Sequence, residues 1–282
     1  MTTTTNATTT AETGLSTQRS PFASAYSDIL AVAQRNLIAL RRTPQLVVFS
    51  TIQPVIFVLM FRYVFGGAIR VPGIPYVDYL MPGIFVQTAA FGAMGTAIGL
   101  ATDLKSGLLE RFQSLPMARS AVLVGRTVSD LFRNVFVMAL MACVGFLVGF
   151  RAPNGLVALV FGMLLVLLFS YALTWVFATV GLAVGDPESA QAAGFPVLAP
   201  LVFASSAFVP VSSMPGWLQA FAAHQPVSVT ASAVRALVLG PDAAQQLLGG
   251  STASFVLQSV AWSVGILLVC APLAVARYRR AL

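Results

Sequence analysis

Three charged side chains at the start of the third long apolar run are the densest titratable cluster in the apolar part of the sequence. Arg126, Asp130 and Arg133 stand four and three residues apart, so a helix places them on one face, where they can form ion pairs. Charged groups inside a membrane are costly and often mark proton or ion relays. A carboxylate between two arginines is equally typical of a self-neutralised cluster at the membrane surface, and we favour that interpretation. The apolar runs otherwise hold almost no titratable residues, which gives proton or sodium coupling no visible carrier.

Two further patterns resemble catalytic or metal-binding motifs but lack essential parts. Lys105-Ser106 has Leu104 before it, where a phosphate-binding loop needs a glycine, so we expect no ATP hydrolysis by this chain. Cys143 and Cys270 lie inside apolar stretches without a neighbouring Cys or His cluster, which favours neither a disulfide nor a metal site. We therefore expect a protein that is not an enzyme and holds no cofactor or metal of its own.

Composition sets the class of protein. The 282 residues are 57% hydrophobic and only 9% charged, whereas a soluble domain carries about 25% charged residues. So few charges cannot cover a water-soluble surface, which excludes an ordinary soluble enzyme. The net charge of +7 comes from 15 arginines and one lysine without a dense basic tract, so we expect no nucleic-acid partner.

Apolar runs long enough to cross about 30 Å of hydrocarbon predict an all-α integral membrane protein with six transmembrane helices. The predicted spans are 46–66, 79–101, 127–150, 156–184, 190–210 and 252–275. When the connecting segments are assigned alternately to the two faces, twelve Arg and Lys residues fall on one face and four on the other. Because cytoplasmic loops are enriched in positive charge, both termini are expected in the cytoplasm.

Small residues recur at a spacing that favours close helix contacts within the spans. Gly95-xxx-Gly99, Gly145-xxx-Gly149 and Gly181-xxx-Gly185 each place two glycines on one helix face. We expect neighbouring helices to approach closely there, although 22 glycines in one chain make such pairs weak indicators.

The N-terminal part precedes the membrane domain, which we assign to residues 44–282. Residues 1–20 are Thr-rich and lack an apolar segment, which predicts a disordered cytoplasmic tail and no signal peptide. Residues 21–43 show helical apolar spacing after a Ser20-Pro21 start and end in arginines. This pattern predicts an amphipathic helix at the membrane interface; a helix packed on another protein surface is the alternative.

The segment between the second and third spans, residues 103–115, is also amphipathic. Leu104, Leu108, Phe112 and Leu115 recur every three or four positions before Pro116. A short helix of this kind can present an apolar face to a cytoplasmic partner or rest on the membrane surface, and periodicity leaves both open.

Residues 211–251, before the last span, are too apolar for a free loop. Two helices of about three turns fit there, around Trp217 and from 229 to 239, with a break at His224-Gln225-Pro226. We predict a re-entrant or interfacial helical hairpin on the extracellular side, with an ordinary extracellular loop as the alternative. The lone histidine is more typical of a hydrogen-bonded structural residue than of a proton sensor.

Two stretches of sequence carry a family resemblance. One is Leu109 to Arg119 (LERFQSLPMAR), followed by Gly125-Arg126 and Asp130; the other comprises MPGWLQ (214–219), HQPVS (224–228) and AVR (233–235). Together they resemble type-2 ABC exporter permeases, most of all the daunorubicin/doxorubicin-resistance branch. The resemblance covers about residues 25 to 280 and keeps both motifs in order.

The resemblance implies a half-transporter with six helices per chain. A second permease chain, identical or homologous, and two ATPase subunits that bind ATP and Mg would complete it, in contact with membrane lipids. Residues 21–43 would be the connecting helix and 103–115 the coupling helix. The implied coupling contacts are Leu104, Leu108, Glu110, Arg111 and Phe112, and the implied extracellular gate residues are Trp217, His224, Gln225 and Pro226.

The same resemblance assigns the substrate path to spans two and five. Aromatic faces with a few amide or hydroxyl groups suit an amphipathic or lipid-like compound, although each such side chain can also serve helix packing. The candidate residues are Phe85, Gln87, Phe91, Phe195, Phe203 and Ser206.

We therefore expect the membrane subunit of an ABC exporter that moves an amphipathic drug or lipid across the bacterial cytoplasmic membrane. Two alternatives remain at this stage. An ATP-independent secondary carrier would respond to ion gradients alone, which the scarcity of buried acids disfavours. A non-transporting membrane protein would bind a partner and move nothing.

Overall fold

The computed structural model describes residues 44–69, 71–107 and 119–281, and all regular structure in these ranges is helical. The longer helices are α3 (Tyr76–Lys105), α5 (Arg119–Val148), α6 (Gly155–Val184) and α11 (Thr252–Ala281). The shorter ones are α2 (Pro44–Leu59), the π-helical turn η1 (Met60–Phe65), α7 (Pro187–Phe203), η2 (Val211–Ser213), α8 (Gly216–His224), α9 (Pro226–Leu239) and α10 (Pro241–Leu248). The all-helical class predicted from the sequence is confirmed for these residues.

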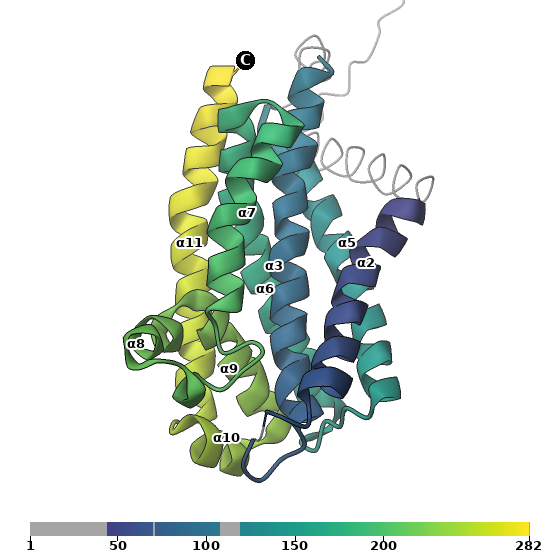
Figure 1. Ribbon diagram of the computed structural model, residues 1–282. Coiled ribbons are helices and arrows are strands. Elements are labelled where there is room, and N and C mark those ends of the chain that lie inside the picture. The colour runs from purple at the N-terminus through teal and green to yellow at the C-terminus, as the bar shows by residue number, and fades with distance from the viewer. Residues whose placement is uncertain (1–43, 70, 108–118, 282) are drawn as a thin grey trace, which may run out of the picture.

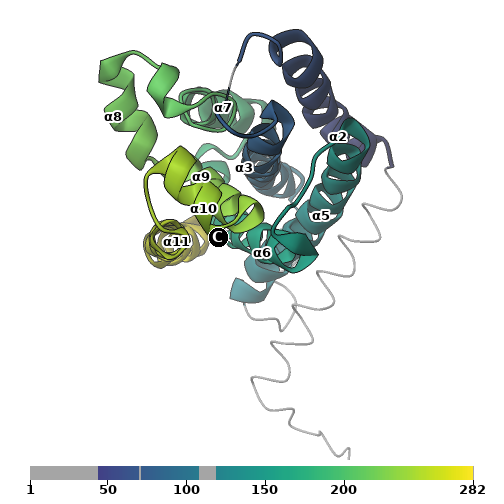
Figure 2. The ribbon, with the colours of Figure 1, turned by 90° about the horizontal axis from the view of Figure 1, so that it is seen from below.

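Helix α3 lies at the centre of the bundle, packed against α5, α6, α7 and α9 (Figures 1 and 2). Its residues are buried without interruption from Tyr76 to Ala90. Such burial requires small residues where other backbones approach: a Cβ at Gly83 would collide with the carbonyl of Ala207. The side chains of α3 are therefore the ones that internal contacts and internal cavities use.

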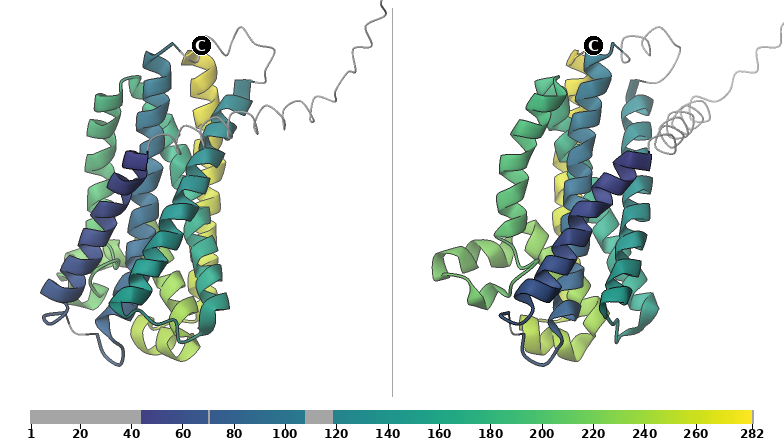
Figure 3. Two further views of the ribbon diagram at one scale, coloured as in Figure 1. Left: turned by 90° about the vertical axis from the view of Figure 1, so that its right-hand side faces the viewer. Right: turned by 45° about the vertical axis from the view of Figure 1, so that its right-hand side comes forward.

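Four helices among the described residues are long and apolar enough to cross a membrane: Tyr76–Lys105, Leu123–Val148, Gly155–Val184 and Thr252–Arg279. They cover four of the six predicted spans. The predicted first span corresponds to α2 continued by η1. Figure 3 shows this helix inclined to α3, so that its N-terminal end stands away from the bundle axis.

The predicted fifth span is shorter as a helix than the apolar run implied. Helix α7 ends at Phe203, and its 17 residues extend about 26 Å. Pro196 and Pro200 lie inside its last two turns and donate no backbone hydrogen bond, which weakens the helix there. At its start, Asp186 caps the helix by accepting from the Ser189 N–H at 3.1 Å, with Pro187 in the first turn.

The region before α11 forms the two helices expected from the sequence. Helix α8 ends at His224 and α9 begins at Pro226, because Gln225 is extended and proline favours the first helical turn. Helix α9 is buried along most of its length, whereas α8 projects sideways from the bundle (Figures 1 and 3). The sequence did not predict α10, which packs against α9.

Several predictions lie outside the described residues. These are the tail 1–20, the interfacial helix 21–43 and four of the coupling residues, namely Leu108, Glu110, Arg111 and Phe112. The fifth, Leu104, lies in the last turn of α3 and is partly buried among the residues around Leu100 and Trp175.

Candidate functional site

An ion-pair layer joins α3 and α5 near the end of α3 that leads to residues 108–118. Asp130 of α5 lies 3.6 Å from Arg126 Nε and 3.5 Å from Arg133 Nη2, so the pairing predicted for one helix face is confirmed. Two partners come from α3. Arg126 Nη1 donates to Asp103 at 2.8 Å, and Thr96 donates to Asp130 at 2.6 Å. The layer contains two cations and two carboxylates, so it neutralises itself while linking the two helices.

The glycine pair of α3 makes room for this layer. A Cβ at Gly99 would collide with the guanidinium of Arg126, and one at Gly95 would come within 2.9 Å of Arg133 Nη2. The predicted close contact is therefore made with arginine side chains lying against α3. Gly181 of α6 does approach a neighbouring backbone, that of Ala97.

Gly145 also lies close to a neighbouring helix, since a Cβ there would come within 2.6 Å of Met81 Cε, whereas the remaining two glycines of the predicted pairs serve different purposes. Gly149 and Gly185 have φ of +102° and +71°, which a glycine tolerates, and Gly185 ends α6 in the left-handed conformation. Glycines four residues apart in this sequence therefore mark helix ends as well as helix contacts.

A second ion pair lies at the same end of the bundle. Lys105 Nζ, on the last residue of α3, is 2.7 Å from Asp186 Oδ1 in the turn between α6 and α7. The Lys105 ammonium, together with the Ser189 N–H, lowers the pKa of Asp186 to about 2. The end of α3 is thus attached both to α5 and to the start of α7.

A buried arginine organises the opposite end of the bundle. Arg235 of α9 is 1% exposed and donates to the carbonyls of Tyr79 (2.8 Å), Ser206 (2.6 Å) and Ala207 (2.9 Å). It also donates to the Ser206 hydroxyl at 3.2 Å, and its guanidinium lies 3.8 Å from the centre of the Tyr79 ring. One side chain therefore joins α3, α9 and the chain that follows α7.

Other side chains satisfy the carbonyls where α7 ends. Gln225 donates to Leu201 and Ala204 at 2.7 and 3.2 Å, and Tyr76 donates to Phe208 at 2.8 Å. In lipid, backbone groups released by the end of a helix must find protein partners. Gln225, which the sequence analysis assigned to the gate, thus holds the end of α7.

The other predicted gate residues lie on or beside α8. Trp217 is 79% exposed, and His224 is exposed with its Nδ1 3.0 Å from the Ala220 carbonyl of the same helix. Pro226 starts α9. The hairpin therefore consists of a buried arm, α9, and an exposed arm, α8.

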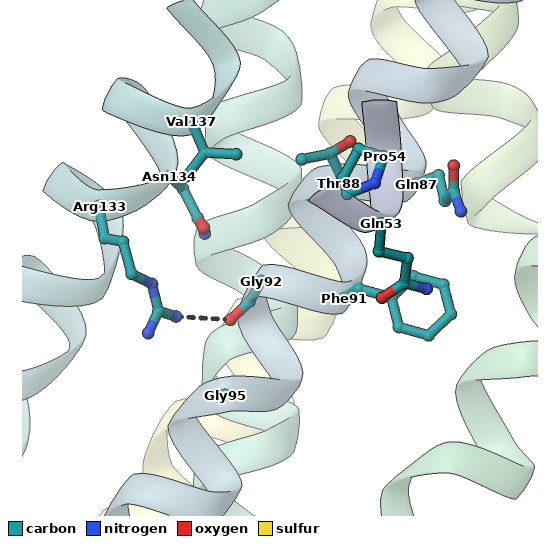
Figure 4. Close-up of a pocket in the computed structure, with 10 residues that line it drawn as sticks. All are labelled: Gln53, Pro54, Gln87, Thr88, Phe91, Gly92, Gly95, Arg133, Asn134 and Val137. Atoms are coloured by element: carbon teal, nitrogen blue, oxygen red, sulfur yellow. Dashed lines mark hydrogen bonds between the residues drawn. The ribbon is translucent and has the colours of Figure 1, made fainter. Parts of the chain in front are cut away.

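A cleft of about 160 Å³ opens between α2, α3 and α5. It is lined by Gln53, Pro54, Gln87, Thr88, Phe91, Gly92, Gly95, Arg133, Asn134 and Val137. Figure 4 shows Gln53 beside Phe91 and Arg133 reaching from α5 to the Gly92 carbonyl, which accepts a hydrogen bond of 2.8 Å. Asn134 donates to Ser170 at 2.7 Å.

The predicted path residues are divided between this cleft and other surroundings. Gln87 and Phe91 line the cleft, whereas Phe85 is fully buried against Phe150 with ring centres 6.2 Å apart. Phe195 lies half exposed on α7, 6.3 Å from the Phe91 ring. The remaining two predicted path residues lie at the other end of the bundle.

Phe203 and Ser206, the remaining two path residues, lie where α7 ends. Phe203 is half exposed and its ring centre is 5.7 Å from that of Phe208, which stacks on Phe61 of η1 at 4.6 Å. Ser206 is buried beneath Arg235 and also lines a cavity of about 210 Å³ with Tyr79. This aromatic cluster joins the two shorter predicted spans.

The sequence model for the ABC-2 type transporter matches residues 27–239, most of the chain. The chain belongs to the ABC-2 type transporter family. It is 34% identical over 270 residues to the daunorubicin resistance ABC transporter permease protein DrrB1 of Streptomyces coeruleorubidus, covering 93% of this chain and 89% of that protein.

Two relatives from Mycobacterium tuberculosis agree with this assignment. A protein described as a probable doxorubicin resistance ABC transporter permease, DrrC, is 30% identical over 237 residues, covering 83% of this chain and 82% of its own length. The doxorubicin resistance permease DrrB is 27% identical over 196 residues, 65% of this chain and 66% of that protein.

The chain is thus a multi-pass membrane protein and the permease subunit of an ABC-2 exporter in the drug-resistance branch, as the sequence analysis expected. Permease subunits of this kind do not hydrolyse ATP, which is also as expected. The family match spans both motifs on which the resemblance was based, including the residues of the ion-pair layer and the hairpin up to Leu239.

Three of the residues that hold this permease together had no such role predicted from the sequence, although Asp103 lies in the predicted coupling segment and Arg235 in the second family motif. Asp103 and Thr96 complete the ion-pair layer from α3, and Arg235 binds the end of α7. For Arg235 a signal was present: it is the single charged residue of α9 and stands among residues of an otherwise apolar helix. A charge in such a place needs buried acceptors.

Proposed function

We propose that this permease pairs with a second permease, identical or homologous, to carry an amphipathic drug or lipid outward across the bacterial cytoplasmic membrane. Two ATPase subunits on the cytoplasmic side would bind ATP and Mg and supply the energy. The names of the relatives support a drug as cargo, since all three reported above are described by daunorubicin or doxorubicin resistance. The two acids buried among the described residues, Asp78 and Asp130, both accept hydrogen bonds, which supports dependence on a partner for energy.

In this proposal the chain crosses the membrane six times, with both termini in the cytoplasm. The four long helices would be joined by α2 with η1 and by α7 with residues 204–210. The end of α3, the start of α5 and the end of α11 lie at one end of the bundle (Figure 1), which supports a common cytoplasmic face. Twelve of the sixteen Arg and Lys residues belong to segments assigned to that face.

The observation that carries the coupling role is how the end of α3 is attached. Asp103 binds Arg126 of α5, and Lys105 binds Asp186 before α7. A force applied to the segment that follows Lys105 therefore acts on three helices together. We propose that residues 103–115, of which 103–105 form the last turn of α3, receive the motion of the ATPase as the coupling segment, with Glu110, Arg111 and Phe112 as its contacts.

The test is co-expression with a candidate ATPase and replacement of Glu110 and Arg111 by alanine. We expect copurification of the ATPase and ATP-driven transport in vesicles to fall together, while the permease itself remains in the membrane. Asp242→Ala on the exposed part of α10 is the control and leaves both unchanged. Unchanged assembly and transport in the double variant would contradict the coupling role.

For the extracellular side we propose that α8 is the moving part of the gate. Helix α9 is held by Arg235, and Gln225 holds the end of α7, so the exposed arm with Trp217 is the one free to swing at the Gln225–Pro226 joint. Ser206 would lie beneath this gate. The path would pass Gln87 and Phe91.

A further inference from the structure

The cleft between α2, α3 and α5 contains two buried polar atoms without a hydrogen-bond partner among the described residues. These are Gln87 Oε1 and Thr88 Oγ1, whose residues are only 1% and 6% exposed. Native proteins contain few such groups, because burying a polar atom without a partner costs free energy. Further along α3 the hydroxyl of Thr96 is paired, with Asp130 at 2.6 Å. Because both residues line the cleft, a rotation of either side chain would present its unpaired oxygen to a polar partner from outside the chain.

The size of the cleft limits what that partner can be. Its volume of about 160 Å³ is close to that of an engineered cavity of about 150 Å³ that binds benzene. One six-membered ring fits, with the remainder of a larger compound lying outside. Phe91 and Val137 provide apolar contacts on opposite sides, from α3 and α5 (Figure 4).

The charges around the cleft limit the partner further. Arg133 lines the cleft, and both polar contacts that it makes within the described residues use Nη2, to the Gly92 carbonyl and to Asp130. A guanidinium carries five N–H donors, so it can also donate to a hydroxyl or carbonyl oxygen. A cation in the cleft would face the guanidinium of Arg133, whereas Asp130, which balances that charge, is not among the lining residues. An anion would compete with Asp130, 3.5 Å from Nη2, and would disturb the ion-pair layer.

We propose that this cleft binds one ring-sized, uncharged, hydroxyl-bearing group of an amphipathic compound. Its hydroxyl groups donate to Gln87 Oε1 and Thr88 Oγ1, its oxygens accept from Arg133, and its ring packs against Phe91. This inference rests on the proposed function and specifies the chemistry of the polar part of the cargo. It also adds α2 and α5 to a path that the family resemblance assigned only to the second and fifth spans.

The test uses three photoreactive probes with the same diazirine-bearing octyl chain: a glucoside, a sulfate and a trimethylammonium salt. Each is added below its micellar concentration to the full permease in lipid nanodiscs, and labelled residues are mapped by mass spectrometry. We expect the glucoside to label residues lining the cleft, and unlabelled octyl glucoside to compete. Gln87→Leu and Thr88→Val each reduce this labelling at least fivefold. Gln258→Leu, the same change on the exposed face of α11, leaves it unchanged.

A stability measurement separates binding from a structural role. Because Gln87 Oε1 has no partner in the described structure, Gln87→Leu without probe keeps or raises the melting temperature. A marked fall, labelling that Gln87→Leu does not change, or equal labelling of the cleft by the trimethylammonium probe would each overturn the inference. ATP-driven transport is measured separately. Transport with an unlabelled cleft overturns this inference alone, and cleft binding without transport in the assembled complex overturns the proposed function alone.

Discussion

Replacing Arg235 by methionine removes the guanidinium that joins three parts of the permease while keeping an unbranched apolar side chain. Three short hydrogen bonds to carbonyls, at 2.8, 2.6 and 2.9 Å, are lost with the contact to the Tyr79 ring. The Ser206 carbonyl still accepts from the Tyr79 hydroxyl at 3.1 Å, so the Ala207 carbonyl is the one whose hydrogen bonding is reduced most.

The expected cost follows from these contacts. An orphaned buried carbonyl costs about 1–3 kcal/mol, and each further hydrogen bond from a charged donor contributes about 1.5–3 kcal/mol before the desolvation of the cation is subtracted. Removing the cation also removes that desolvation cost. We therefore expect a loss of about 3–5 kcal/mol, or roughly 6–20 °C in melting temperature. Arg235→Lys does not restore it, because an ammonium cannot reach carbonyls on both sides as a planar guanidinium does.

The assay is thermal unfolding of the purified permease in nanodiscs, with hydrogen exchange of the amides of residues 204–210. Arg277→Met, at an exposed position of α11, is the matched control and leaves both unchanged. We expect faster exchange at 204–210 in Arg235→Met, while α6 stays protected. If Arg235→Met melts within about 2 °C of the natural protein and exchange at 204–210 is unaltered, Arg235 does not hold the end of α7 as argued here.

Two further predictions concern the cytoplasmic end of the bundle. Gly99→Ala displaces Arg126 and lowers the melting temperature. Gly265→Ala, where an added Cβ meets nothing within 4 Å, leaves the melting temperature unchanged or higher, because alanine favours helix. Equal effects of the two substitutions would refute the role of Gly99 in making room for Arg126. For Asp186, whose pKa is lowered from 3.8 to about 2, the contribution to stability is complete above about pH 5 and is lost as the pH falls through 2. The difference in melting temperature between the natural protein and Asp186→Asn should therefore stay constant from pH 5 to 8 and shrink towards pH 2; a change between pH 6 and 8 would contradict this assignment.

The fold could be predicted well where the information is local. Apolar runs determine where long helices form, and proline placement marked the joint between α8 and α9. The shortening of α7 was harder to predict, because Pro196 and Pro200 are tolerated in many membrane helices. The early end is stabilised by donors from α3, from α9 and from Gln225 before α9, all more than twenty residues away in the sequence.

The candidate site, like the fold, could be predicted from the sequence only where the information is local. The sequence by itself determined the membrane environment, the family and the common face of Arg126, Asp130 and Arg133, because composition, motif and helical spacing are properties of a single segment. Only the tertiary structure decided that Thr96 donates to Asp130, that the buried Arg235 binds the carbonyls beyond the end of α7, and that Gln87 lines a cleft. Helical periodicity specifies which side of a helix is apolar, but the partner of a buried polar group is set by how the helices pack against one another.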